Sequence, residues 1–175
     1  FQLPDQHYRS VEVQRLAKRA GAPIVVGTIL QNDDGTFTNS TLVFDEDGAT
    51  DLRYDKRRPV PFAEYMPNRA FFGALAPELV GMVQLEYSFG QLPAVLPIDT
   101  GAGEVRAGIA ICFDIVFDDH AVALMNGGTT DDGRPTDAQL ILAQTNNADF
   151  GRTDQSAQQL QIAKLRAVET GRALV

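Results

Sequence analysis

The segment VRAGIAIC, residues 105–112, is an apolar run that ends in the single cysteine of the chain and is followed at once by Phe113 and Asp114. Small and β-branched residues in such a run are typical of a strand buried inside a sheet. We therefore predict a strand over 105–112 with a turn directly behind it. A cysteine in that position lies at the edge of the sheet, where a nucleophile is accessible.

The segments on both sides of this strand predict alternating helices and strands. Helices are expected where apolar residues recur at helical spacing and capping residues stand at the ends, which is the case over 8–20, 118–126 (with Asp118 as its cap) and 155–170. Further strands are expected in short apolar runs between turn residues, over 23–30, 38–44, 51–55 and 138–144. Such alternation indicates an α/β fold built in layers.

Two segments break this alternation. Three prolines between 57 and 67 remove backbone donors, so this stretch is expected to be an ordered loop. The apolar segment 71–87 is expected to contain a short helix after Pro77. No composition shift marks a second domain, so we expect one domain over 1–175.

Composition argues against several functional classes. The net charge is −8 and the densest basic cluster is Lys56–Arg58, so a nucleic-acid-binding surface is not expected. His7, His120 and Cys112 are far apart and lack the spacing of metal ligands, so neither a metal nor another cofactor is expected. The apolar runs are much shorter than the ~20 residues of a membrane span.

Cys112 is the first candidate catalytic residue. A cysteine that closes a hydrophobic strand is most often a small core residue. Its place at the strand end favours the alternative, a thiol nucleophile for acyl transfer. The next backbone N–H, that of Phe113, would then face the oxyanion of a tetrahedral intermediate.

The loop YDKRRPVPFAEYMP, residues 54–67, supplies two further candidates, Lys56 and Glu64. Both side chains are ordinary surface charges unless the fold brings them to the thiol. An ammonium group beside the thiol would lower its pKa and stabilise an oxyanion. A carboxylate on a proline-stiffened loop could orient that lysine or position an acceptor amine.

His120 is a weaker candidate. A Cys–His pair with Cys112 is one hypothesis, because histidine activates cysteine nucleophiles in many enzymes. The sequence Asp118-Asp119-His120 is explained more simply as the capped start of a helix.

Together these segments resemble one family. YDKRRPVPFAEYMP, GIAICFDIVF, TNNADFG and the helix QSAQQLQIAKLRAVETGR follow one another in the order found in the nitrilase-type (carbon–nitrogen hydrolase) domain of apolipoprotein N-acyltransferases. The blocks extend from Pro23 to Arg172 and so cover most of the chain. The lysine loop is the most specific of them, because plain amidases of the superfamily rarely carry V-P-F-x-E-Y.

The resemblance implies a nitrilase-like α-β-β-α sandwich, incomplete at both ends of this chain. It implies a bacterial membrane enzyme that takes an acyl chain from a phospholipid as a cysteine thioester and passes it to the N-terminal diacylglyceryl-cysteine of a lipoprotein. Cys112 would be the nucleophile, Lys56 the triad lysine and Glu64 an additional essential glutamate. Phe113 and Asp114 would support the site.

The chain also departs from the family pattern. The general-base glutamate is expected upstream of Phe1, and Glu12 lies within the first predicted helix, so no residue here is assigned that role. The chain is therefore expected to be a piece of a larger membrane protein, with its membrane segments elsewhere, and to be inactive alone. Ala63 replaces the usual glycine, Asp149 the usual tryptophan, and Asp114 shortens the usual glutamate.

Three functional hypotheses follow. The first is the acyltransferase, in the cytoplasmic membrane of a bacterium with its catalytic domain on the extracytoplasmic face. The second is a soluble amidase of the same superfamily that transfers the acyl group to water, and the third is an inactive fold fragment. Phe71 and Phe72 are expected either to form part of a lipid-contacting lid or to pack beneath a loop.

Overall fold

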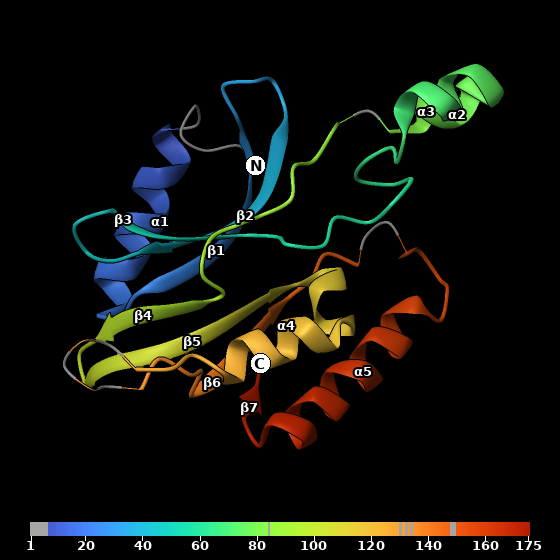
Figure 1. Cartoon of the computed structure of the whole chain (residues 1–175). Helices are drawn as coiled ribbons and strands as arrows, with labels where there is room; N and C mark the ends of the chain where they lie inside the picture. Colours follow the sequence, from blue (N-terminus) through green and yellow to red (C-terminus); the bar gives the residue numbers. More distant parts are fainter. Residues whose placement is uncertain (1–6, 84, 130, 132, 134, 148–149) are drawn as a thin grey trace.

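Two β-sheets packed face to face form the centre of the computed structural model, which describes residues 7–83, 85–129, 131, 133, 135–147 and 150–175 (Figure 1). The first sheet is antiparallel and contains β1 (Ile24–Gln31), β2 (Phe37–Phe44) and β3 (Ala49–Asp55) in that order. The second has the order β4-β5-β6-β7 and consists of Val95–Thr100, Gly103–Ile111, Leu140–Gln144 and Ala173–Leu174. Its β4–β5 pair is antiparallel, whereas β5, β6 and β7 run parallel.

Helices cover the outer faces of both sheets. Helix α1 (His7–Ala20) packs on the first sheet, while α4 (Asp118–Met125) and α5 (Gln155–Thr170) lie on the outer side of the second (Figure 1). This arrangement is the predicted nitrilase-like α-β-β-α sandwich. Two short helices, α2 (Arg69–Leu75) and α3 (Pro77–Met82), project away from the layers. In the described part of the chain, no helix has the length and apolar character needed to cross a membrane.

The main core lies between the two sheets. Val43 and Tyr54 of the first sheet meet Ile109 of the second, and all three are almost fully buried. A Cβ atom on Gly108 of β5 would lie 3.1 Å from Leu124 Cδ2 of α4 and 2.9 Å from the Ala138 Cβ. The strand that leads to the cysteine is therefore packed closely on both of its faces.

Most predicted elements are confirmed within two residues at each end, and three details of the prediction were wrong. Cys112 belongs to a 3-10 helix, η1 (Cys112–Val116), rather than to the strand. Asp118 does not cap α4, because the helix starts at Asp118 itself and its carboxylate accepts a hydrogen bond from Arg166 instead. Strands β4 and β7 and helix α2 were not predicted.

Candidate active site

Cys112 occupies a strained turn at the end of β5. Its φ angle is +50°, in the left-handed region that residues other than glycine seldom adopt. Strand β5 ends at Ile111, η1 begins at the cysteine, and the thiol is partly exposed. Backbone strain of this kind persists where the surroundings hold it, and it is concentrated at functional sites. The predicted place of the cysteine, between a strand end and a helical turn, is confirmed.

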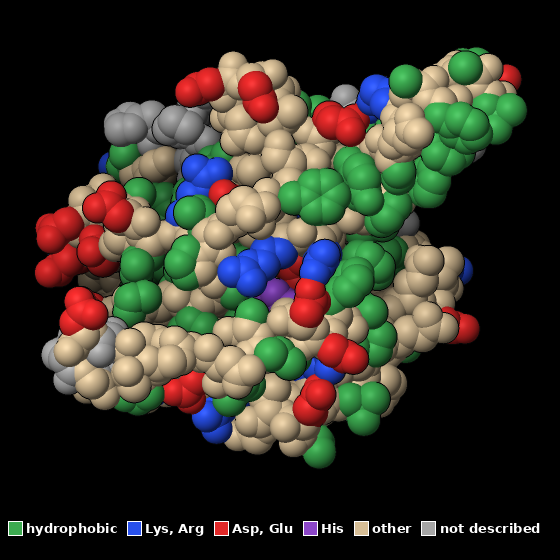
Figure 2. Space-filling model, in the orientation of Figure 1, with side chains coloured by type: hydrophobic (Ala, Val, Ile, Leu, Met, Phe, Trp, Pro, Cys, Tyr) green, Lys and Arg blue, Asp and Glu red, His purple; other side chains and the backbone are tan. Residues whose placement is uncertain are grey.

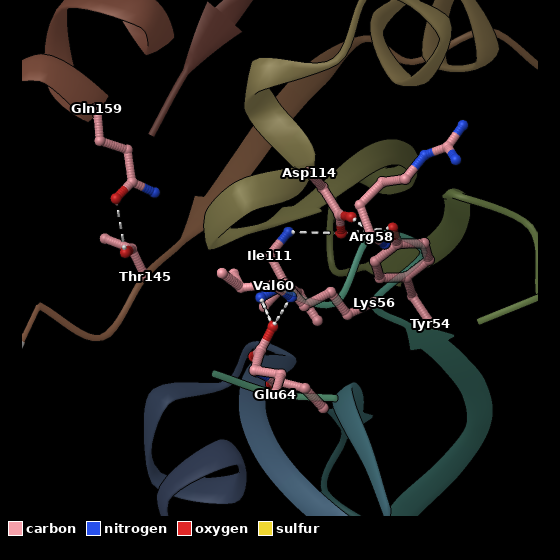
Figure 3. A network of polar contacts seen from close by, with 10 residues as sticks. Tyr54, Lys56, Arg58, Val60, Glu64, Ile111, Asp114, Thr145 and Gln159 are labelled. Carbon is pink, nitrogen blue, oxygen red and sulfur yellow. Dashed lines mark hydrogen bonds and ion pairs between the residues drawn. The ribbon is translucent and has the colours of Figure 1, made fainter. Parts of the chain in front are cut away.

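Asp114 fastens this turn to the opposite sheet. Its buried carboxylate accepts hydrogen bonds from the Tyr54 hydroxyl at 2.7 Å, the Arg58 backbone N–H at 2.9 Å and the Ile111 N–H at 3.2 Å (Figure 3). Burial, and then the charge of Asp114, raises the pKa of Tyr54, so its hydroxyl remains a proton donor. The loop after β3 is thereby held against the turn after β5.

Lys56 and Glu64 are in direct contact, as one reading of the sequence predicted. The Lys56 ammonium lies 2.6 Å from Glu64 Oε2, and the lysine side chain is only 2% exposed. The same carboxylate oxygen accepts the Val60 N–H at 2.6 Å, and Asn39 Nδ2 donates to Oε1 at 3.4 Å (Figure 3). These extra donors offset part of the cost of burying a charged pair.

The loop that carries this pair is itself anchored. The Lys56 N–H donates to Asn39 O at 2.8 Å, and its carbonyl accepts from Gly90 N at 2.8 Å. Lys56 is two residues before Arg58 and Cys112 is two residues before Asp114, and Arg58 and Asp114 are hydrogen-bonded to each other. The structure thus brings the lysine loop and the cysteine turn together, although they are far apart in the sequence.

Phe113 follows the cysteine within η1. Its ring packs edge-to-face on Phe117 at a centroid distance of 5.0 Å. The first N–H groups of a helix have no acceptor within the helix, so the start of η1 is a suitable place for oxyanion donors. A thiol, a buried ammonium and backbone donors in one region provide the groups that acyl transfer requires.

His120 lies behind the cysteine strand, and its imidazole is 3% exposed. Its Nε2 is 2.9 Å from the carbonyl oxygen of Ile109, while its Nδ1 is buried without a hydrogen-bond partner in the described part of the chain. Its position in the first turn of α4 agrees with the simpler reading of this segment, although Phe117 rather than an aspartate is the N-cap residue.

A pH effect on stability is expected from His120. Burial is the main effect and lowers the pKa of its imidazole below the usual 6.5. The charge of Arg57 lowers the pKa further, whereas the charges of Asp114 and Asp119 raise it and offset part of the shift. Below pH 6.5 the unfolded chain binds a proton that the folded chain does not, so the free energy of unfolding falls as the pH decreases. In urea titrations between pH 7.5 and 5.5, His120→Gln should show a smaller decrease than the wild type. Equal decreases would contradict this assignment.

Sequence reasoning did not identify Tyr54 or Asn39 as parts of the site. Tyr54 orients Asp114 from 60 positions away, and Asn39 contacts Glu64 from 25 positions away. The departure noted at Asp149 lies outside the described residues. Among the described residues, no group of three or more His, Cys, Asp or Glu side chains is arranged to hold a metal ion.

Comparisons with known proteins agree with this geometry. The sequence pattern of the carbon-nitrogen hydrolase family matches residues 11–175. An apolipoprotein N-acyltransferase of Mycolicibacterium smegmatis is 33% identical over 95% of this chain and 26% of its own length. An apolipoprotein N-acyltransferase of Allorhizobium ampelinum is 30% identical over 91% of this chain and 29% of its own length. The chain therefore spans between a quarter and a third of these relatives.

Solved structures support the fold. A carbon-nitrogen hydrolase from Helicobacter pylori G27 superimposes with a TM-score of 0.63 at 16% identity, over 96% of this chain and 50% of that one. Nit3 of Saccharomyces cerevisiae, a nitrilase-superfamily member, has a TM-score of 0.61 at 18% identity and covers 99% of this chain and 51% of its own. At this level of identity the similarity establishes the architecture alone.

Proposed function

The chain belongs to the carbon-nitrogen hydrolase family, and we propose that it carries the nucleophile of an N-acyltransferase that acts on phospholipid and lipoprotein. One observation carries most of this proposal: the loop that holds Lys56 and Glu64 in contact is the segment whose sequence resembles the lysine motif of apolipoprotein N-acyltransferases, and relatives of that name are 30% and 33% identical to this chain. On this basis Cys112, Lys56 and Glu64 are assigned as catalytic residues.

The first half-reaction would form a thioester. The Cys112 thiol transfers its proton to a general base, a role that we assign to none of the residues named here, and Sγ attacks the ester carbonyl carbon of the phospholipid. The C–S bond forms, the electron pair moves to the carbonyl oxygen, and collapse breaks the C–O bond. The lysophospholipid leaves after its alkoxide takes up the proton. Lys56 and the Phe113 N–H would stabilise the oxyanion.

The second half-reaction would transfer the acyl group to nitrogen. The unprotonated α-amino group of the lipoprotein's N-terminal diacylglyceryl-cysteine attacks the thioester carbon. A C–N bond forms, the C–S bond breaks, and the amine proton returns through the base to the thiolate. In the amidase alternative, Sγ attacks an amide carbonyl instead, the C–N bond breaks as the amine leaves with a proton, and water then hydrolyses the thioester to a free carboxylic acid.

Glu64 and Asp114 would have different roles in this mechanism. Glu64 Oε2 accepts hydrogen bonds from both the Lys56 ammonium and the Val60 N–H, so it fixes where the cationic group lies. Among the described residues, Asp114 makes no hydrogen bond or ion pair with Lys56 and instead secures the turn that presents Cys112. Asp114 is therefore proposed as a positioning residue, and Glu64 as a catalytic one.

The projecting α2–α3 arm would provide the approach for lipid. Phe62, Phe71 and Leu75 on or beside it are 45%, 55% and 69% exposed, and the Phe72 ring packs edge-to-face against both phenylalanines. Figure 2 shows this apolar surface extending from the body of the molecule. An exposed cluster of this kind suits contact with acyl chains. We place the catalytic domain at the extracytoplasmic face of a bacterial cytoplasmic membrane.

The apolar arm can be tested with Phe71→Asp in the full-length protein. Because the ring is 55% exposed, the charge should change the melting temperature little. The concentration of vesicle phospholipid needed for half-maximal acyl transfer should rise about tenfold or more. Ala74→Asp, at an exposed position of the same helix, is the matched control for an added charge. Unchanged phospholipid dependence in a stable Phe71→Asp protein would refute a lipid-contacting role.

The proposed function itself is tested by mass spectrometry of the full-length protein. Incubation with phospholipid alone should add one acyl group to the peptide that contains Cys112, and a later addition of diacylglyceryl peptide should remove it as an N-acyl product. Release of free fatty acid without N-acylation would show that water, rather than the amine, takes the acyl group and would favour a hydrolase. Absence of any adduct, together with absence of N-acylated peptide, would overturn the proposal.

A further inference from the structure

A hollow of about 390 Å³ opens beside the cysteine turn, between the loop after Lys56, residues 89–91 and the start of α4. Figure 2 shows this hollow on the visible face, with Lys/Arg side chains at its mouth and a histidine beneath them. Its volume falls within the range of small-molecule sites, whereas well-packed interiors leave few voids larger than a water molecule. A ligand larger than a simple ion therefore fits.

The hollow is cationic although the chain as a whole is acidic. Arg57 and Arg58 both line it, with Asp119 as the one carboxylate. Arg58 is paired with Asp119. Arg57 donates one hydrogen bond, to the Leu92 carbonyl at 3.0 Å, and no carboxylate lies within 4.0 Å of it among the residues that the structure describes. One guanidinium charge is thus left without a counter-ion.

His120 lines the same hollow, but its imidazole is not suited to bind an anion. Its Nε2 lies 2.9 Å from the Ile109 carbonyl oxygen and donates to it, so Nδ1 of the neutral ring carries a lone pair, which repels an anion. The Arg57 charge is therefore the feature of the hollow that favours an anionic ligand.

The hollow is also close to the proposed chemistry. Arg57 directly follows Lys56, and the backbone N–H of Arg58 is bonded to Asp114, two residues beyond Cys112. In a glycerophospholipid, only a few bonds separate the phosphate from the acyl ester. A lipid whose ester carbon reaches the thiol would therefore place its phosphate near this wall of the site.

We propose that Arg57 and Arg58 bind the phosphate group of the phospholipid donor in this hollow, an inference that rests on the proposed function. Arginine is suited to this task because its planar fork donates two parallel hydrogen bonds to phosphate oxygens. A carboxylate would use fewer of the available donors and would fill less of the space. Arg57 makes the main contact, because Arg58 is already committed to Asp119.

Binding is measured first, because it does not require turnover. Calorimetric titrations of the full-length protein use glycerophosphoethanolamine, inorganic phosphate and, as a neutral probe, glycerol. Glycerophosphoethanolamine should bind, and Arg57→Gln should weaken it about tenfold or more, whereas Arg57→Lys should retain part of the affinity. Arg15→Gln, an exposed arginine on α1 paired with Glu12, should leave it unchanged.

The outcomes of the titrations are distinct. Equal binding by the wild type and a folded Arg57→Gln protein would overturn the proposal, as would the absence of binding by glycerophosphoethanolamine. Binding of inorganic phosphate alone would identify a free-phosphate site and would likewise overturn the headgroup assignment.

A second measurement separates this site from the proposed function. Thioester formation on Cys112 is followed with phospholipid and with a phosphate-free p-nitrophenyl acyl ester. Arg57→Gln should impair the reaction with phospholipid about tenfold more than the reaction with the ester. Equal impairment would contradict a phosphate contact. If the wild type forms no thioester from either donor, the proposed function fails, while the titrations still decide whether the hollow binds the headgroup.

Discussion

Cys112→Ser in the full-length protein is expected to lower the rate of acyl transfer by at least about 10³-fold, the range seen when a covalent nucleophile is removed. The thiolate is the reactive form of cysteine, and a serine hydroxyl at the same position has a much higher pKa, so little of it ionises at neutral pH. Mass spectrometry should then find no acyl group on the peptide that contains position 112.

The serine variant should fold normally. Serine is close in size to cysteine, and residue 112 is partly exposed, so the melting temperature should change by only a few degrees. Cys112→Ala serves as the companion variant, because it removes any oxygen nucleophile as well. Acyl transfer within tenfold of the wild type in either folded variant would show that the cysteine is not the nucleophile.

Long elements of the fold could be predicted from the sequence because local patterns encode them. Helix α5 has the predicted bounds, Gln155–Thr170, since apolar spacing and the following Gly171 both mark it. Strand β4 escaped prediction because Pro97 and Asp99 interrupt its two buried residues, Leu96 and Ile98. An edge strand tolerates proline, which does not need to donate to a neighbour on its open side.

Short elements were missed for a different reason. Helix α2, Arg69–Leu75, has no buried residues, so it lacks the amphipathic spacing by which a helix is normally recognised. It starts where the Asn68 side chain accepts the Phe71 N–H. Strand β7, Ala173–Leu174, exists only because it pairs with β6, and two residues carry no periodicity of their own.

In the candidate site, too, the features encoded by local sequence could be predicted and those that depend on distant residues could not. Cys112, Lys56 and Glu64 could be singled out because reactive residue types stand in unusual local settings. The sequence allowed Glu64 to contact Lys56, but it equally allowed both to be ordinary surface charges. In the folded loop the Val60 N–H and the Lys56 ammonium both donate to Glu64 Oε2, and this holds the carboxylate beside the lysine. The Tyr54–Asp114 bond joins β3 to the turn after β5, and no local pattern encodes a partner 60 residues away.

The second large effect is expected for Lys56→Met, which removes the ammonium and keeps most of the side-chain volume. Acyl transfer should fall by about 10²–10³-fold, the usual result of losing one oxyanion-stabilising group. The variant should also be less stable, because Glu64 loses its buried partner and removal of one member of such a pair costs about 3–5 kcal/mol. Activity and stability therefore both decrease, and a single substitution cannot separate catalysis from folding.

The double variant Lys56→Met/Glu64→Gln separates them. Glutamine retains an oxygen that can accept the Val60 N–H at the position of Glu64 Oε2, but it leaves no uncompensated charge. Urea denaturation should therefore show that stability is partly restored relative to Lys56→Met, while acyl transfer stays about 10²–10³-fold below the wild type. Arg53→Met, which removes a more exposed ion pair on β3, the strand that ends just before Lys56, is the control and should remain active. Recovery of activity together with stability would mean that Lys56 only supports the fold, because an ammonium needed for oxyanion stabilisation cannot be replaced by a neutral, well-packed side chain.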